Sequence, residues 1–176
     1  TTWDLGNDTL SIYDLTDNYS IVVKDDLTIK SGTYLVNGMY GIGVIGGTMT
    51  IDGGVFQAAG DNDYLIGNWS TVIVNDGEFE GQYSCINNTD KAVLEINGGK
   101  FTTAEFDCTG EYESEAVTAN KGVTIKGGSF PKEVYDDYLA DGYCDALEDG
   151  CYVVAIHNYH AVVTDPTCTE GGYTTN

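Results

Sequence analysis

The chain has 176 residues, the length of one domain with or without a short tail. It carries 28 acidic residues against 7 basic residues, all of them lysine, for a formal charge of −21. This charge excludes nucleic acid as a natural partner and argues against an anionic membrane surface, because both need a basic patch. No apolar run approaches the roughly 20 residues of a transmembrane helix, so no membrane insertion is expected.

The first segment, residues 3–16, is expected to form an incomplete coil that closes one end of a repeat array. The array is defined by an eight-residue pattern: apolar, any, Ile or Val, any, small or Asp, Gly, any, aromatic. Its five copies are Leu27–Tyr34, Met49–Phe56, Val72–Phe79, Leu94–Phe101 and Val123–Phe130. Their starts are 22, 23, 22 and 29 residues apart. A unit of this length cannot bury its apolar face alone, so neighbouring units must stack.

The octapeptide predicts a strand, a turn and the start of a second strand. Alternation at positions one and three indicates a strand with one buried face, and glycine at position six permits a turn that side chains would strain. Stacking predicts three ladders of equivalent residues. They are Leu27, Met49, Val72, Leu94 and Val123; Ile29, Ile51, Val74, Ile96 and Ile125; and Tyr34, Phe56, Phe79, Phe101 and Phe130.

A weaker module precedes each octapeptide by 8 to 11 residues. Its copies start at Tyr19, Tyr40, Tyr64, Tyr83 and Glu115. Each coil therefore has at least two strands. The long fourth spacing is absorbed by residues 102–114, an acidic insertion that either projects as a binding loop or is merely tolerated.

These patterns predict an all-β fold, a right-handed parallel β-helix of about five coils over residues 1–156. An antiparallel sandwich is the main rival, but it does not require near-identical copies at a fixed period. Residues 131–140 have helical spacing and are expected to form a helical cap, with Pro131 at its start and Gly142 after its end. Residues 143–156 are expected to add a closing hairpin around Glu148–Gly150.

Five cysteines are present, and none forms a C-x-x-C pair. Cys144 and Cys151 flank a short turn and are the best disulfide candidates in an oxidising compartment. Cys85 and Cys108 are either a second pair or small buried thiols.

The coils, together with the segments Tyr138–Tyr143 and Asp149–Val154, resemble repeat-bearing surface proteins of Gram-positive gut bacteria with pectate-lyase-type β-helices. That resemblance implies a secreted or wall-attached protein, with an adhesin or carbohydrate-binding role. It also implies that residues 157–176 are the truncated start of a following small module or linker, which leaves Cys168 without its neighbouring cysteines.

Catalysis is not expected. Pectate lyases of this fold use an arginine as base, and this chain has none. Hydrolases of the same fold use aspartates near a histidine, and both histidines, His157 and His160, follow the solenoid.

Acidic turns offer oxygen ligands for Ca²⁺. Asp61 and Asp63, with Asp52 before them and Asp76 after them, are the candidates; the alternative is that these are solvated acidic turns. No other cofactor is indicated.

Sugar binding requires exposed aromatic faces beside amides and carboxylates. Trp69 breaks the local pattern and is the leading candidate. The others are Tyr40, Tyr64, Tyr83, Asn68, Asn87 and Asn88. The alternative is that the tyrosines form one more packing ladder. The sequence therefore favours a non-catalytic surface segment that binds a polysaccharide, a host glycan or a host protein. The other interpretations are a stalk or spacer and, behind it, a polysaccharide hydrolase or lyase.

Overall fold

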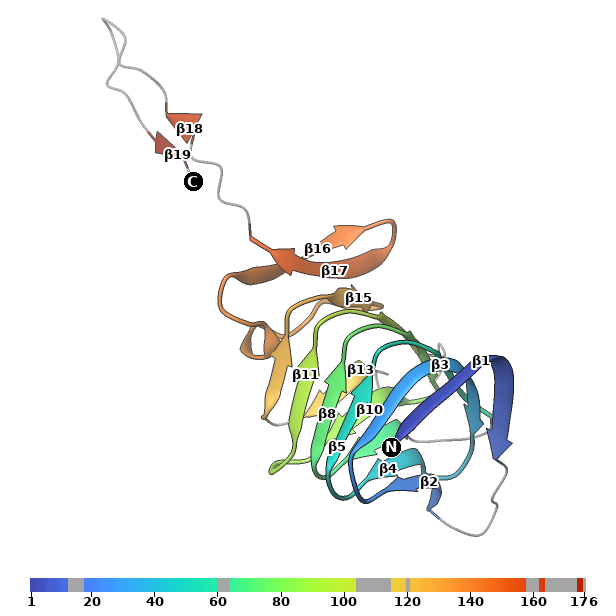
Figure 1. Cartoon of the computed structure of the whole chain (residues 1–176). Helices are drawn as coiled ribbons and strands as arrows, with labels where there is room; N and C mark the ends of the chain where they lie inside the picture. The colour runs from blue at the N-terminus through green and yellow to red at the C-terminus, as the bar shows by residue number, and fades with distance from the viewer. Residues whose placement is uncertain are drawn as a thin grey trace, which may run out of the picture.

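A computed structural model describes residues 1–12, 18–59, 64–103, 115–119, 121–157, 162–163 and 174–175. The chain winds into a parallel β-helix, with the strands of successive coils side by side (Figure 1). The stacked strands amount to about four full turns, slightly fewer than the five coils predicted.

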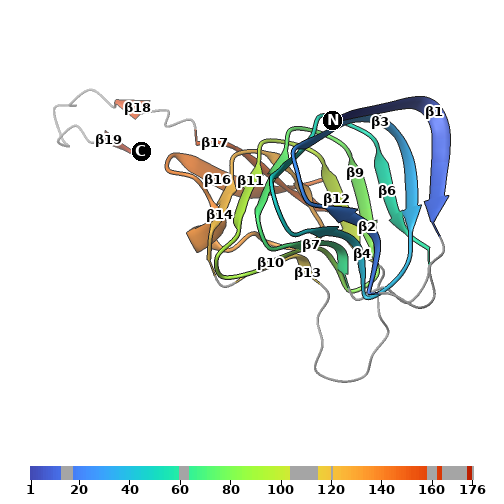
Figure 2. The same ribbon diagram turned by 60° about the horizontal axis from the view of Figure 1, so that its bottom comes forward.

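Three faces surround the core. The first face contains the start of β3 (Leu27–Val36) with β5 (Thr48–Ile51), β8 (Thr71–Val74), β11 (Val93–Ile96) and β14 (Val123–Ile125). The second contains the end of β3 with β6 (Val55–Ala58), β9 (Glu78–Gly81), β12 (Lys100–Thr103) and β15 (Gly128–Phe130). The third is a separate sheet of β2 (Tyr19–Val23), β4 (Tyr40–Val44), β7 (Tyr64–Asn68), β10 (Ser84–Asn88) and β13 (Glu115–Ala119). Figure 2 shows the strands of this third sheet along one side of the coil.

All three predicted ladders are confirmed. The two aliphatic ladders follow the register of the first face. The aromatic ladder is a column of stacked rings with centroids 4.7–5.0 Å apart and almost fully buried side chains. The five glycines at octapeptide position six have φ between +101° and +131°, a region in which a side chain is strained. Each repeat therefore turns the corner at its glycine and places its aromatic residue inside.

The register of the third sheet corrects one detail of the predicted module. Tyr19, Tyr40 and Tyr64 are aligned, but the next residue in register is Ser84 and not Tyr83. Ser84 is buried and in turn pairs with Glu115. The tyrosine row therefore ends at β7.

Both ends of the coil carry additional structure. At the N-terminal end, β1 (Thr2–Ile12) runs parallel to β3, as an incomplete first coil should. At the C-terminal end, β16 (Tyr143–Glu148) and β17 (Cys151–Ile156) form the predicted hairpin, and β17 pairs antiparallel with β15. Asp149 and Gly150, with φ of 48° and 86°, make the tight turn between them.

The predicted helical cap is wrong. Within residues 131–140 the structure has only the 3₁₀ turn η1 (Asp136–Tyr138). An α-helix does not form there because the backbone of this segment pairs with the last coil instead. Leu139 forms a parallel bridge with Ile125, and the Ala140 amide donates to the Ile125 carbonyl. These bonds complete the edge of β14, which a helix could not do.

The tail contributes two short antiparallel strands, β18 (Val162–Val163) and β19 (Thr174–Thr175). No helix in the described residues is long and apolar enough to span a membrane.

Candidate binding surface

The most distinctive surface feature lies on the outside of the third sheet. The rings of Tyr19, Tyr40 and Tyr64 stack along the coil axis, with centroids 5.6 and 5.2 Å apart. Trp69 lies beside the stack and contacts Tyr19 and Tyr40 at steep angles of 86° and 77°. All four side chains are partly exposed. We call these four residues the outer aromatic cluster.

Two glycines form the floor under this cluster. A β-carbon at Gly67 would lie 2.5 Å from the Trp69 ring and 2.6 Å from the Tyr40 ring. One at Gly43 would lie 2.4 Å from the Tyr19 ring. Neighbouring strands carry Val22 and Asn87 at the matching positions. The rings can lie against the sheet because β4 and β7 lack a side chain there.

The geometry of the stack determines which aromatic surfaces meet solvent. Tyr40 is sandwiched between Tyr19 and Tyr64, so the tyrosine faces are largely occupied by one another. Trp69 therefore meets the tyrosine edges, in the T-shaped arrangement that aromatic rings favour. The tyrosines do stack on one another, as the alternative interpretation of a packing ladder predicted. This ladder lies on the outer surface of the sheet and is not part of the hydrophobic core.

The structure brings most of the predicted sugar-binding residues to this surface. Tyr83 meets Tyr64 edge-on at 5.6 Å, and Asn87 is in register with Gly67 and so shares its outward face. Tyr19 is the member of the cluster that was not predicted from the sequence as a sugar-binding residue. Its place at the start of the first module is the signal that could have identified it.

The predicted role of Asn68 in sugar binding is wrong. Its side chain is fully buried, which removes it from any surface site. Its amide donates to the Asn88 side chain at 2.7 Å and to the Val93 carbonyl at 2.9 Å. Its side-chain oxygen accepts the Ser70 amide. Asn88 is also buried and donates to the Lys121 carbonyl. The two asparagines hold the turns inside the coil.

The predicted calcium ligands are only partly described. The Asp52 carboxylate accepts the Asn75 side-chain amide at 2.8 Å, and the Asp76 carboxylate accepts the amide of Gly77. Asp61 and Asp63 lie outside the described residues. In the part of the chain that the structure describes, no group of three or more His, Cys, Asp or Glu side chains is arranged to hold a metal ion.

The proposed disulfide between Cys144 and Cys151 is wrong. In the hairpin, Cys144 pairs with Ala155 and Cys151 pairs with Glu148, so the two cysteines lie far apart along the strands. Both are free.

Cys85 is a free, fully buried thiol, and Cys108 lies outside the described residues. The Cys85 thiol lies 3.1 Å from the Thr102 carbonyl oxygen. Burial raises the pKa of Cys85 to about 12. This side chain is therefore an unreactive core thiol in the folded chain.

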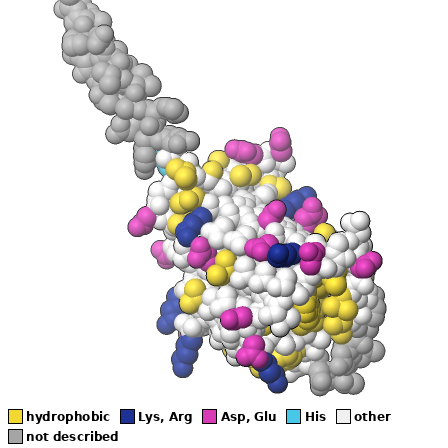
Figure 3. Space-filling model, viewed as in Figure 1, with side chains coloured by type: hydrophobic (Ala, Val, Ile, Leu, Met, Phe, Trp, Pro, Cys, Tyr) yellow, Lys and Arg dark blue, Asp and Glu magenta, His cyan; other side chains and the backbone are white. Residues whose placement is uncertain are grey.

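Carboxylates are spread over the surface and do not gather at one point on the face shown in Figure 3. His157 is exposed beyond the hairpin, where its amide donates to the Gly142 carbonyl, and His160 lies outside the described residues.

Comparisons with known proteins found no match. No protein family, no curated protein and no solved structure matches this chain.

Proposed function

We propose that this chain is a non-catalytic binding segment of an extracellular bacterial surface protein, of the adhesin or carbohydrate-binding kind. The observation that carries the proposal is the outer aromatic cluster on its glycine floor. These aromatic rings lie outside the core and add nothing to the packing of the core. Even so, glycine at positions 43 and 67 leaves the space in which the rings lie against the sheet.

Trp69 is the proposed contact residue. Its ring meets the Tyr19 and Tyr40 rings at steep angles and is only partly buried, so part of its surface is available for the apolar side of a sugar ring. Asn87 is on the same outer face and supplies an amide for hydroxyl groups. The resemblance to surface proteins of Gram-positive gut bacteria supports an extracellular location and a glycan or host protein as partner.

A stalk or spacer is the second candidate. The face-to-face packing of the tyrosines favours it, since rings that cover one another stiffen a coil without offering flat faces. A spacer has no ligand, so the two functions differ in a direct binding experiment.

The test is retention of the purified chain on insoluble plant polysaccharides, immobilised pectin and mucin, with added calcium or with chelator. We expect retention on at least one glycan, lost in Trp69→Ala and kept in Leu147→Ala. Leu147 is a suitable control because it is an exposed apolar residue on the C-terminal hairpin, outside both the outer aromatic cluster and the C-terminal cavity. Loss of retention with chelator alone would assign binding to the acidic turns, and no retention by a folded protein would favour the spacer.

A further inference from the structure

The C-terminal end of the coil contains a cavity of about 220 Å³ between β13 and the segment that follows β15. It arises because the three faces of the last coil are closed differently. β15 pairs with β17, and β14 is bridged by Leu139. In the described part of the chain, β13 is the last strand of its sheet.

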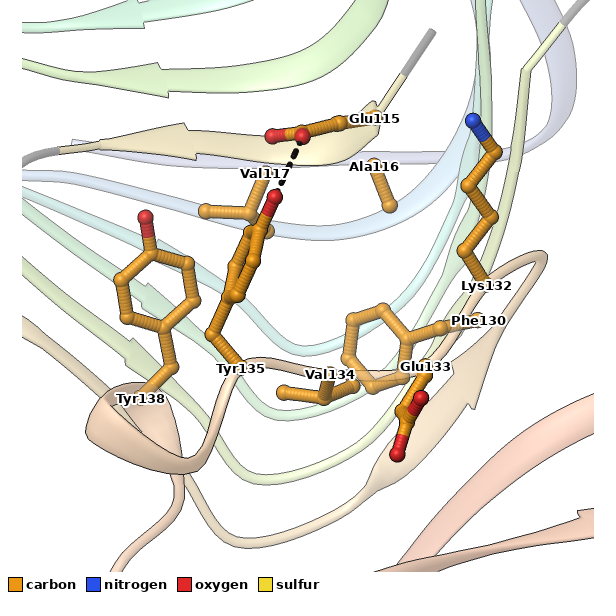
Figure 4. A pocket seen from close by; sticks show the side chains of 9 residues that line it. All are labelled: Glu115, Ala116, Val117, Phe130, Lys132, Glu133, Val134, Tyr135 and Tyr138. Atoms are coloured by element: carbon orange, nitrogen blue, oxygen red, sulfur yellow. Dashed lines mark hydrogen bonds between the residues drawn. The ribbon is translucent and has the colours of Figure 1, made fainter. Parts of the chain in front are cut away.

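Side chains close the third face instead of a strand. The Tyr138 hydroxyl donates to the Ala119 carbonyl, and the Tyr135 hydroxyl donates to the Glu115 carboxylate at 2.8 Å. The two tyrosines meet edge-on at 5.4 Å. Figure 4 shows them rising from the cap toward β13, with Lys132 on the opposite side of the cavity.

The cavity is lined by apolar side chains and by a carboxylate. Phe130, Val134 and Val117 give the cavity an apolar lining. Glu115 supplies a carboxylate that Tyr135 holds in position. Burial raises the pKa of Tyr138, and the negative charge of Glu115 adds to the rise.

Within the described ranges, the Glu115 carboxylate accepts the Tyr135 hydroxyl, and no ion pair that joins it to a lysine is seen. An ion pair is formed elsewhere, between Lys126 and Glu95, at 2.8 Å. A fixed carboxylate beside aromatic rings and above an apolar lining is the arrangement that receives an organic cation. The chain's charge of −21 raises the local concentration of such ligands.

We infer that this cavity binds an alkylammonium group, with its ammonium at Glu115 and Tyr135 and its carbon chain against Phe130 and Val134. The shared chemistry fits a lysine side chain of a partner polypeptide and a free aliphatic amine. The inference does not depend on the outer aromatic cluster, which lies on the outside of the third sheet.

The test is a titration of the ¹⁵N-labelled chain, followed by amide chemical shifts. Two probes represent the two sources: Nα-acetyl-lysine amide for a polypeptide and cadaverine for a free amine. Nα-acetyl-norleucine amide is the matched neutral control, since it has an aliphatic chain but no ammonium. We expect saturable shifts at residues 115–117 with either cationic probe and none with norleucine. The stronger probe identifies the source.

Four variants complete the test, each checked for its fold by thermal melting. Glu115→Gln should weaken binding about tenfold, because it removes the charge but keeps the size. Tyr135→Ala should weaken it about fivefold through loss of the ring, and Tyr135→Phe less, because the ring remains. Glu78→Gln changes an exposed carboxylate on β9 and should have no effect.

Three results would overturn the inference. Equal binding of norleucine would show a merely apolar cavity. Equal loss in Glu78→Gln would show that the cations bind only through the overall charge. Shifts absent from residues 115–117 would place binding elsewhere or nowhere.

Discussion

Two aromatic stacks run along the same coil, one inside and one outside. The inner stack, Tyr34 to Phe130, continues through every repeat with near-parallel rings and almost no exposed area. The outer stack has three tyrosines, ends where Ser84 takes the next place, and has Trp69 set against its edges.

The difference shows what repetition contributes in this fold. The core position of the inner stack carries an aromatic residue in all five repeats, because a smaller side chain in any coil would leave a void in the core. A position outside the core carries no such requirement. The outer aromatic cluster occupies only part of the coil, as expected of a local feature and not of a folding requirement.

The largest expected difference between the two stacks is in stability, and it is tested by truncating one ring in each stack. Phe79→Ala should lower the free energy of unfolding by about 3–5 kcal/mol, because it leaves a cavity between two stacked phenylalanines. Tyr40→Ala should cost about 1 kcal/mol, since its ring is partly exposed. Urea denaturation measures both. Equal costs would mean that the outer stack supports the fold as much as the inner one.

The pH dependence of stability separates the core from the surface in another way. Burial raises the pKa of Cys85 from its ordinary 9.0 to about 12. Between these values the unfolded chain loses a proton that the folded chain keeps. Stability should therefore fall by about 1.4 kcal/mol per pH unit from this residue alone. Cys85→Ala should show a shallower decline over the same pH range. Parallel curves for the two proteins would contradict the buried thiol.

The glycine floor can be tested directly. Gly67→Ala places a methyl group where the Trp69 and Tyr40 rings lie, so the indole must move at a cost of about 1 kcal/mol. In a Trp3→Phe background Trp69 is the only tryptophan, and its fluorescence should change. Asn87→Ala, at the position in register with Gly67, is the control and should leave the emission unchanged. An unchanged spectrum in Gly67→Ala would show that the floor is not needed.

The smallest effect is expected at the partly exposed ion pair between Lys126 and Glu95. The hydrogen bond from Lys126 holds the pKa of Glu95 below its ordinary value. The contribution of this hydrogen bond to the free energy of unfolding is fully present when the pH is above the ordinary pKa of a glutamate. It is lost as the pH falls through the lowered pKa of Glu95. Glu95→Gln should cost less than about 1 kcal/mol at neutral pH, and nothing in strong acid or high salt. Urea denaturation at two pH values measures the difference, and a cost that persists in acid would point to packing.

The sequence predicted the octapeptide face well because its period and its side-chain alternation describe the same geometry. Ile29 and Ile51 must stack once one repeat is placed on the next. The third sheet was predicted less well. Tyr83 resembles the earlier tyrosines, but a one-residue offset puts Ser84 in register, and burial decided between them.

The wrong predictions share a physical cause. Helical spacing over residues 131–140 was overridden by the unpaired backbone groups of β14, which Leu139 and Ala140 complete. Cys144 and Cys151 are close in sequence, but hairpin register separates them. Asn68 is polar, yet the turn it stabilises lies inside the coil. In each case a long-range backbone partner decided the outcome, and a local pattern does not contain that information.

The closing hairpin has a consequence for how such a chain can change its length. β17 runs antiparallel to β15, so the hairpin ends the series of parallel strands on that face. A new coil added after it would have no parallel edge to join there. Growth or shrinkage must therefore take place between the caps. Removing one internal repeat unit of 22 residues, from Val72 to Val93, would bring two equivalent levels together and leave the structure at both ends in place.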